Sequence, residues 1–276
     1  MRREEDIDLI KYLSSLGYAK NKAKTYVRLG FVKVNGREIK KLPYLLKKND
    51  EVKITKDKEK QYDIHIVYED DNYLVVDKEA GLLTISTSNQ MKKEEDTLYK
   101  RVRAYLNQKR EYAFIVNRID KETSGLVIFV KNEALKEQLQ KNWNAIVTKR
   151  SYIAIVPGII TKKGHIDNYL YEDKMTFTHS TKVGGKRAIT DYVPIKNNHQ
   201  YTMLNVEIKT GRKNQIRVHL KELGYPILGD KKYGSKLNPL KRLALHHDKI
   251  SLIDPITHKE LTFTSIVPKE FYDLLH

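Results

Sequence analysis

The sequence predicts an α+β protein in which a mostly antiparallel mixed sheet with flanking helices is preceded by a small α/β domain. Segments with the apolar pattern of strands outnumber segments with helical spacing, and the two kinds do not alternate regularly. The stretch from residue 56 to residue 62 is charged, has no apolar period and is typical of a linker. We therefore expect a small domain over residues 1–56 and a larger domain over residues 63–276.

Composition restricts the kind of protein and the kind of partner. The 276 residues include 52 Lys and Arg against 35 Asp and Glu, a net charge of +17 that favours a polyanionic partner. The chain has no Cys, which excludes disulfides and thiolate metal sites. No apolar run approaches the roughly 20 residues of a membrane span, and the first residues are charged. We expect a cytoplasmic monomer with no membrane contact.

The first 56 residues combine a predicted pattern of two helices and a hairpin with many basic side chains. Ile7, Ile10 and Leu13 have helical spacing, a second helix is predicted from about residue 20 to 29, and Asn35-Gly36 is a strong hairpin signal. A further strand is predicted at 51–54. Ten basic residues and one acid, Glu38, lie between residues 17 and 48; the basic ones are Lys20, Lys22, Lys24, Arg28, Lys33, Arg37, Lys40, Lys41, Lys47 and Lys48.

This pattern resembles the small RNA-binding domain named after the fourth protein of the small ribosomal subunit. Lys20, Lys24 and Arg28 recur every four residues and share one helical face. Together with Arg37 on the hairpin, they are the residues that we expect to contact RNA. A solvated lysine-rich surface on an ordinary small domain is the alternative interpretation.

The larger domain is predicted to contain these elements in order: strands at 64–68 and 73–77, a polar segment at 86–96, a helix with Leu98 and Val102, strands around 117–125, a helix with Leu135, Leu139 and Trp143, strands at 150–156, 188–193 and 201–208, a helix with Ile216 and Leu220, a glycine-punctuated loop at 224–234, strands at 243–252 and 260–263, and a helix after Pro268. We expect Trp143 to pack on an apolar helix face.

The stretch from Asn117 to Gly125 is the candidate site. It is a polar loop between two apolar runs, 113–116 and 126–130, and loops fixed by strands at both ends often carry chemistry. Asp120 is a candidate nucleophile or base, and Arg118 is suited to bind a phosphate or a carboxylate. Alone, a string of this kind is most often a charged hairpin with an Asx-type turn.

Four stretches in the same order resemble the motifs of the RluA-type pseudouridine synthases, which isomerise uridine in ribosomal or transfer RNA. The central motif is Asn-Arg-Ile-Asp-Lys-Glu-Thr-Ser-Gly at 117–125. The others are Glu-Asp-Asp-Asn-Tyr-Leu-Val-Val-Asp-Lys-Glu-Ala-Gly at 69–81, Lys-Arg-Ser-Tyr-Ile-Ala at 149–154 and Thr-Gly-Arg-Lys-Asn-Gln-Ile-Arg-Val-His at 210–219. Asn117 and Asn214 stand where many members have His, and Glu79 stands where Pro is usual.

The resemblance implies a pseudouridine synthase fold and a catalytic set of Asp120, Tyr152 and Arg217. Asp120 would act as the nucleophile, Arg217 would be its charge partner, and Tyr152 would stack on the target base or help to remove the proton from carbon 5. Arg118 and Arg212 are expected to contact RNA. The target base must leave its stack to reach the aspartate, so base flipping or a single-stranded loop is implied. No cofactor and no metal is expected.

Other functions are also considered. A non-catalytic ribosome-associated RNA-binding factor would use only the basic domain, and an N-glycosidase would need a second carboxylate to activate water. Ser124 has no His and acid partner by motif, which disfavours a serine hydrolase. Among RNA targets, the N-terminal domain favours large-subunit ribosomal RNA over transfer RNA.

Overall fold

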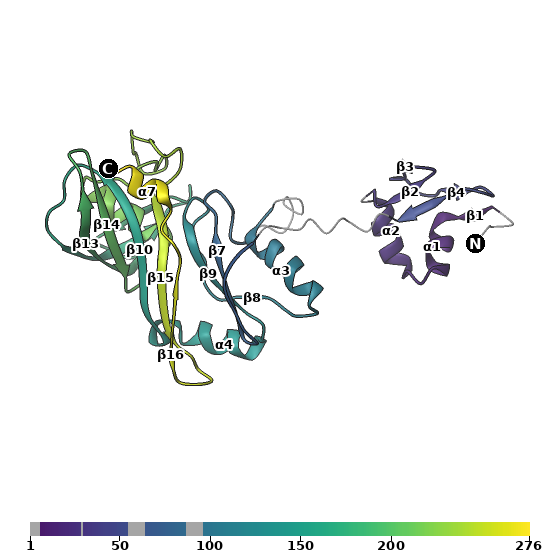
Figure 1. Cartoon of the computed structure of the whole chain (residues 1–276), viewed down its shortest axis with the longest axis horizontal. Helices are drawn as coiled ribbons and strands as arrows, with labels where there is room; N and C mark the ends of the chain where they lie inside the picture. Colours follow the sequence, from purple (N-terminus) through teal and green to yellow (C-terminus); the bar gives the residue numbers. More distant parts are fainter. Residues whose placement is uncertain (1–5, 29, 55–63, 87–95) are drawn as a thin grey trace. The chain divides into compact units, whose positions relative to one another are not determined.

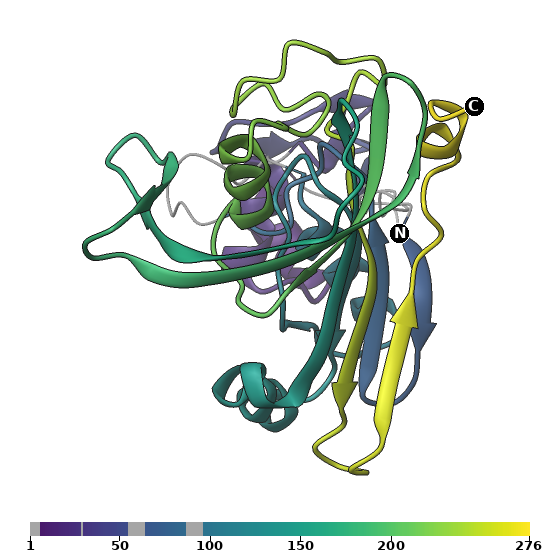
Figure 2. The same ribbon diagram turned by 90° about the vertical axis from the view of Figure 1, so that its left-hand side faces the viewer.

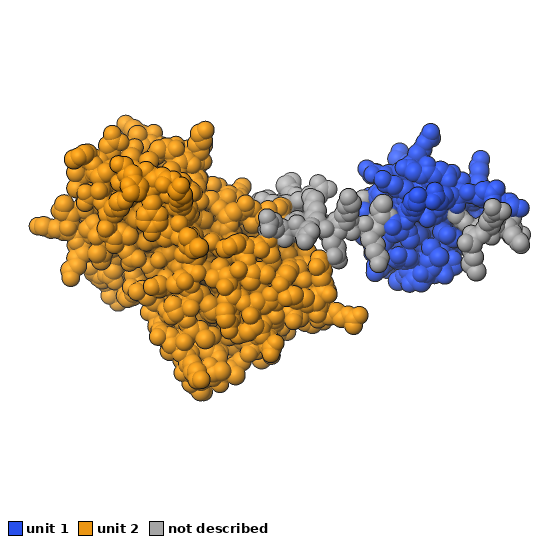
Figure 3. Space-filling view, in the orientation of Figure 1, with its two compact units in different colours: residues 1–62 blue, residues 63–276 orange. Residues whose placement is uncertain are grey.

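The computed structural model describes residues 6–28, 30–54, 64–86 and 96–276 (Figure 1). The chain divides into two compact units, residues 1–62 and 63–276, which are coloured separately in Figure 3. The predicted linker and most of the predicted polar segment at 86–96 lie outside the described residues. In the described part of the chain, no helix has the length and hydropathy needed to cross a membrane.

The first unit packs two helices against short strands. It contains β1 (Ile7–Asp8), α1 (Leu9–Ser15), α2 (Lys20–Arg28), β2 (Val32–Val34), β3 (Arg37–Glu38), β4 (Leu45–Leu46) and β5 (Val52–Ile54). The side chain of Asp8 accepts hydrogen bonds from the backbone of Ile10 and Lys11 and so caps α1. Asn35 and Gly36 both have positive φ, at 49° and 81°, as the predicted two-residue hairpin requires.

The second unit contains β6 (His65–Glu69), β7 (Tyr73–Lys78), α3 (Leu98–Gln108), β8 (Phe114–Ile115), β9 (Ser124–Val130), α4 (Glu133–Lys141), α5 (Trp143–Ile146), β10 (Val147–Pro157), β11 (Gly164–Glu172), β12 (Thr178–Thr181), β13 (Lys186–Asn197), β14 (Tyr201–Ile208), α6 (Gln215–Glu222), β15 (Leu245–Ile253), β16 (Glu260–Thr264) and α7 (Lys269–Asp273).

These strands form one curved sheet in the order β12-β11-β13-β14-β10-β15-β9-β7-β6, with β16 on β15 and β8 on β9 (Figure 2). Its pairings are antiparallel except for β9 with β15, which are parallel over the pairs Ser124 to His246 and Gly125 to His247. The predicted α+β class with a mostly antiparallel sheet is confirmed. The strand before the candidate site is shorter than the apolar run 113–116 that predicted it, because only Phe114 and Ile115 are in a strand.

The half of the sheet that carries β7 and β9 is covered on both faces. Leu74 and Val127 pack with α3 in one core cluster, whereas Val75 and Leu126 pack with α4 in another. Burial on both faces explains why these strands are continuous apolar runs rather than alternating ones. Trp143 packs against the α4 side, in agreement with its predicted packing role.

Candidate active site

Asp120 lies in a turn that leads directly into β9. The backbone N–H of Thr123 donates to the carbonyl of Asp120 at 3.1 Å, which closes a four-residue turn with exposed Lys121 and Glu122 at its centre. Ile119 is buried before the aspartate. The turn therefore fixes the backbone of Asp120 while its carboxylate, 28% exposed, faces the site.

Residues 78–84, which include the end of the first motif, hold this turn through hydrogen bonds. The hydroxyl of Thr84 donates to the carbonyl of Ile119 at 2.7 Å, and the N–H of Gly81 donates to the carbonyl of Lys121 at 2.9 Å. The buried Lys78 donates to the carbonyls of Lys121, Leu82 and Glu79 at 3.0, 2.7 and 2.8 Å. Burial lowers the pKa of Lys78 to about 7, against the raising effect of nearby Glu122 and Asp120.

Gly125 is required where β9 meets β15. Its φ is +113°, and a Cβ at this position would lie 2.3 Å from the carbonyl oxygen of His247. Only glycine combines this backbone conformation with such a close approach. The last residue of the central motif therefore sets the distance between the loop of Asp120 and the strand β15.

Arg217 has two carboxylate neighbours rather than one. Its guanidinium forms a two-point pair with the fully buried Asp230, with Nε to Oδ2 at 2.8 Å and Nη2 to Oδ1 at 2.7 Å. Nη1 donates to Oδ1 of Asn214 at 2.9 Å and lies 3.6 Å from Oδ2 of Asp120. The structure thus brings Asp120 and Arg217 together, as expected from sequence, but the closer partner is Asp230, which sequence reasoning missed.

The charges around Asp120 act in opposite directions. Burial raises the pKa of the Asp120 carboxyl above its ordinary range, and the positive charge of Arg217 opposes this shift without cancelling it. Asp230 adds to the raising effect. The carboxylate form of Asp120 therefore depends on the position of the Arg217 guanidinium.

Tyr152 is buried, and its phenol lies within electrostatic range of the Asp120 carboxylate. Its ring stacks on the imidazole of His247, with centroids 4.4 Å apart and planes at 13°. Burial raises the pKa of the Tyr152 phenol, and the charge of Asp120 contributes in the same direction. Burial also lowers the pKa of His247 to about 4, so the ring beneath the tyrosine is neutral at pH 7.

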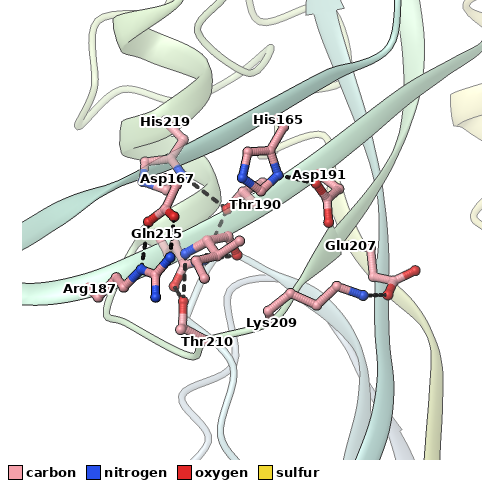
Figure 4. Close-up of polar contacts among 11 residues, drawn as sticks. His165, Asp167, Arg187, Thr190, Asp191, Glu207, Lys209, Thr210, Gln215 and His219 are labelled. Carbon is pink, nitrogen blue, oxygen red and sulfur yellow. Dashed lines mark hydrogen bonds and ion pairs between the residues drawn. The ribbon is translucent and has the colours of Figure 1, made fainter.

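A buried polar network holds the helix that carries Arg217. Gln215 donates to the carbonyl of Ile189 and to the hydroxyl of Thr190, both at 2.9 Å, and accepts from Thr210 at 2.8 Å. The imidazole of His219 lies within 2.8 Å of Oγ1 of Thr190 at one nitrogen (Figure 4). These bonds tie α6 to β13, so the position of Arg217 follows from the position of the sheet.

Asn214 begins this helix in the left-handed conformation, with φ of 55°. Among residues other than glycine, Asn is one of the few that adopts this conformation readily. Its side-chain oxygen accepts from Arg217, which gives this departure from the usual family pattern a structural role. The other two departures are also accommodated, because Asn117 accepts from the N–H of Ile128 at 2.7 Å and Glu79 pairs with Arg101 at 2.8 Å.

Ser124 has a histidine neighbour that no sequence motif indicated. Its hydroxyl lies 2.9 Å from Nδ1 of His246, and Nε2 of His246 lies 3.1 Å from the hydroxyl of Ser265, which donates to Asp77 at 2.6 Å. Arg242 also donates to Ser124, and both Ser124 and His246 are buried. The pair was missed because it forms across the β9 to β15 junction. The serine is enclosed by these contacts, which supports a structural function.

The residues expected to contact RNA are dispersed. Lys20 and Lys24 line one hollow of about 620 Å³ in the first unit, with Lys11 and Pro43. Arg28 and Arg37 are exposed in the same unit but do not line that hollow. In the second unit, Arg118 is exposed two residues before Asp120, and Arg212 donates to the carbonyl of Arg187 at 2.9 Å. Among the residues that the structure describes, no group of three or more His, Asp or Glu side chains is arranged to hold a metal ion.

The mostly antiparallel sheet brings the Asp120 carboxylate to the Arg217 guanidinium, with the Tyr152 phenol within electrostatic range, and this cluster is a candidate catalytic site. The family model described as RNA pseudouridylate synthase matches residues 72–222, more than half of the chain, and the S4 domain model matches residues 9–52. The chain belongs to the RNA pseudouridylate synthase family and is an RNA pseudouridine synthase with an N-terminal S4 domain. The family resemblance noted from the motifs is confirmed.

Several known proteins are similar over most of their length. "Ribosomal large subunit pseudouridine synthase D" of Borreliella burgdorferi is 36% identical over 87% of this chain and 79% of that protein. The protein with the same description from Haemophilus influenzae is 29% identical over 94% of this chain and 86% of its own length. "Uncharacterized RNA pseudouridine synthase YlyB" of Bacillus subtilis is 30% identical over 99% of this chain and 94% of that protein.

Solved structures share the fold. Human RNA Pseudouridylate Synthase Domain Containing 4 superposes with a TM-score of 0.62 at 23% identity, over 77% of this chain and 92% of that chain.

Proposed function

We propose that this protein converts uridine to pseudouridine in large-subunit ribosomal RNA, with Asp120 as the nucleophile. The observation that carries the chemical part is the placement of the Asp120 carboxylate 3.6 Å from the guanidinium of Arg217, with the buried Tyr152 within electrostatic range of the carboxylate. The RNA target is suggested by the relatives named as large-subunit ribosomal enzymes.

In this proposal the carboxylate of Asp120 attacks carbon 1′ of the ribose, and the bond from carbon 1′ to nitrogen 1 breaks with its electron pair on the uracil. The uracil turns within the pocket, carbon 5 bonds to carbon 1′, and the carboxylate leaves. Carbon 5 then loses its proton and nitrogen 1 takes up a proton, so the product contains the same atoms as the substrate. Because no water is consumed, a second carboxylate to activate water is unnecessary.

Arg217 stabilises the carboxylate of Asp120 before the attack and after its release. Asp230 is a positioning residue, since it holds two of the guanidinium nitrogens and directs the third toward Asp120. The target base must be turned out of its stack to reach this pocket, and Arg118, exposed beside the aspartate, binds the flanking phosphate. Tyr152 acts as the stacking surface for the base, and its raised pKa disfavours the phenolate form that would take the proton from carbon 5.

The S4 domain is proposed to anchor the RNA. The hollow lined by Lys20 and Lys24 combines positive charge with apolar side chains, which suits a structured RNA segment. The exposed Arg28 and Arg37 extend the positive surface of the same unit.

The RNA target is tested by mapping pseudouridine across total RNA from cells with and without this gene. We expect the loss of one or a few pseudouridines in large-subunit ribosomal RNA. Loss confined to transfer RNA would refute the proposed target and leave the chemistry intact. An unchanged map would support a non-catalytic binding factor instead.

The role of Asp120 is tested by Asp120→Asn, with Glu122→Gln as the control. Both changes replace a carboxylate by its amide in the same turn, but Glu122 is exposed at its centre. Release of tritium from carbon 5 of labelled uridine should fall by at least about 10³-fold for Asp120→Asn and by less than about twofold for Glu122→Gln. Equal activities for the two variants would assign the chemistry to another residue.

A further inference from the structure

An aromatic row leads from the surface of the second unit to the guanidinium of Arg217. Tyr171 on β11 lies 5.6 Å from His179 on β12, and His179 is stacked with Phe177 at 6.3 Å and 27°. Phe177 meets the ring of Tyr233 edge to face at 6.2 Å, and Tyr233 lies 5.1 Å from the guanidinium carbon of Arg217. These four rings, from Tyr171 to Tyr233, are called the aromatic row below.

The row is held in place by the turn between β11 and β12. The carboxylate of Asp173 accepts from the backbone N–H of Phe177 at 2.8 Å and bonds Nε2 of His179 at 2.9 Å. The hydroxyl of Tyr233 accepts from the N–H of Thr178 at 3.1 Å. The rings are therefore aligned before any ligand binds. In Figure 2 this part of the sheet, β11 to β13, extends away from the remaining strands.

Positive charge lies directly on the row. The ammonium of Lys232 is 4.6 Å from the centre of the Phe177 ring and 5.9 Å from that of Tyr233, and it donates to the carbonyl of Thr176 at 2.8 Å. With Lys221 and the rings of Phe177, His179 and Tyr233, it lines a hollow of about 290 Å³. This volume is at the lower limit of ligand pockets and suits one nucleobase rather than a large ligand.

We propose that this hollow is a second nucleotide-binding subsite, which takes an unpaired nucleotide adjacent to the target uridine. Its base stacks on Phe177 and His179, and its phosphate is bound by Lys232 and Lys221. Unpaired RNA bases stack on aromatic side chains, and a basic side chain beside them fits the backbone. The subsite is next to the proposed catalytic residues, because Tyr233 contacts both Arg217 and Phe177.

This inference rests on the proposed function, in which a uridine of RNA reaches Asp120. The subsite would explain how the enzyme holds a base out of its stack. When the uridine is flipped, its neighbour loses a stacking partner, and the aromatic row replaces that partner. The row would thus contribute to the choice of uridine through the nucleotide beside it.

The test uses the full chain and a stem-loop RNA that carries the mapped uridine, with 2-aminopurine placed in turn at each of its two neighbours. Stacking on an aromatic side chain quenches the fluorescence of 2-aminopurine. The variant Phe177→Leu keeps apolar bulk but removes the aromatic face. Phe114→Leu is the matched control, because Phe114 also has a lysine over its ring, Lys136 at 5.6 Å, and lies on β8, which pairs with β9 rather than with the strands of the row.

For the wild type we expect quenching at one of the two neighbours, and Phe177→Leu should abolish it. KM should rise about tenfold for Phe177→Leu, as expected for one lost base stack, with kcat nearly unchanged. Phe114→Leu should match the wild type. His179→Leu, at an exposed position, should give the same pattern as Phe177→Leu without disturbing the core.

A second arm replaces the quenched neighbour by an abasic residue. The wild type should then lose about tenfold in kcat/KM, whereas Phe177→Leu should lose almost nothing further. Equal losses for both proteins, or quenching that survives in Phe177→Leu and His179→Leu, would overturn the subsite. If the wild type fails to modify the stem-loop with its natural sequence, the proposed function fails instead, so the two failures are distinguishable.

Discussion

Arg217→Met should destabilise the second unit strongly, because it leaves the carboxylate of Asp230 buried without its cation. In the structure the side chain of Asp230 is fully buried and takes two hydrogen bonds from Arg217, at 2.7 and 2.8 Å. Removing one partner of a buried ion pair costs about 3–5 kcal/mol. For a domain of this size, each kcal/mol lowers Tm by about 2–4 °C, so the expected decrease is about 6–20 °C.

The control for this experiment is Arg212→Met, the same substitution in the same motif. Arg212 is partly exposed, and its side chain donates to the carbonyl of Arg187 at 2.9 Å. Its loss should lower Tm by no more than about 4 °C. The measurement is thermal unfolding followed by circular dichroism at pH 7. Equal Tm values for the two variants would refute the view that Arg217 is needed to neutralise Asp230.

Double-mutant cycles measure separately how strongly Arg217 is coupled to Asp230 and to Asp120. The stability coupling of Arg217 to Asp230 should exceed its coupling to Asp120, because the first pair is closer and more buried. A larger coupling to Asp120 would mean that Asp120, and not Asp230, is the main partner of Arg217 in stability.

Three further predictions concern other parts of the chain. Deletion of residues 1–56 should weaken RNA binding and reduce the slope of log Kd against log salt, measured by filter binding; an unchanged slope would contradict an anchoring role. Glu69→Gln should cost about 1–3 kcal/mol at pH 7 in urea unfolding. Burial opposes the charge of Glu69, but bonds from Lys109, Tyr105 and Lys131 outweigh it and lower the pKa to about 2. Because the folded-state pKa is lowered, the stabilisation from ionised Glu69 is fully present above about pH 4.5 and is lost as pH falls toward 2. The loss of stability in Glu69→Gln should therefore vanish near pH 2. A loss that stays constant with pH would argue against the ion pairs. Gly125→Ala should cost about 3–5 kcal/mol, whereas Gly224→Ala, with positive φ but open space, should cost about 1–2 kcal/mol; similar losses would remove the close contact with β15 as the cause.

Local patterns determine what the sequence could predict. The Asn35-Gly36 hairpin and the helical stripes depend on neighbouring residues, and these elements appear close to their expected positions. The pairing of Asp120 with Arg217 could be anticipated only from the ordered family motifs. Their separation in the chain is too large for any periodicity to connect them.

Asp230 and the aromatic row could not be predicted in this way. Asp230 lies in a loop that shows only glycine punctuation, and its function depends on how that loop packs against α6. The alignment of Tyr171 with His179 follows from the register of β11 and β12. Register is set by the whole sheet, so the two rings do not stand out in the sequence.

The short pairing of β9 with β15 makes the number of residues in the central motif more important for the position of Asp120 than the side chains in its middle. The pairing covers only Ser124 with His246 and Gly125 with His247, and the turn of Asp120 begins four residues before Ser124. Lys121 and Glu122 are exposed and contribute their backbone to the turn, so their side chains are free to vary. Inserting or deleting one residue there would turn the Asp120 carboxylate away from Arg217 or disrupt the pairing of β9 with β15. In related sequences and in engineered variants, this segment should therefore tolerate substitution but not a change in the number of residues.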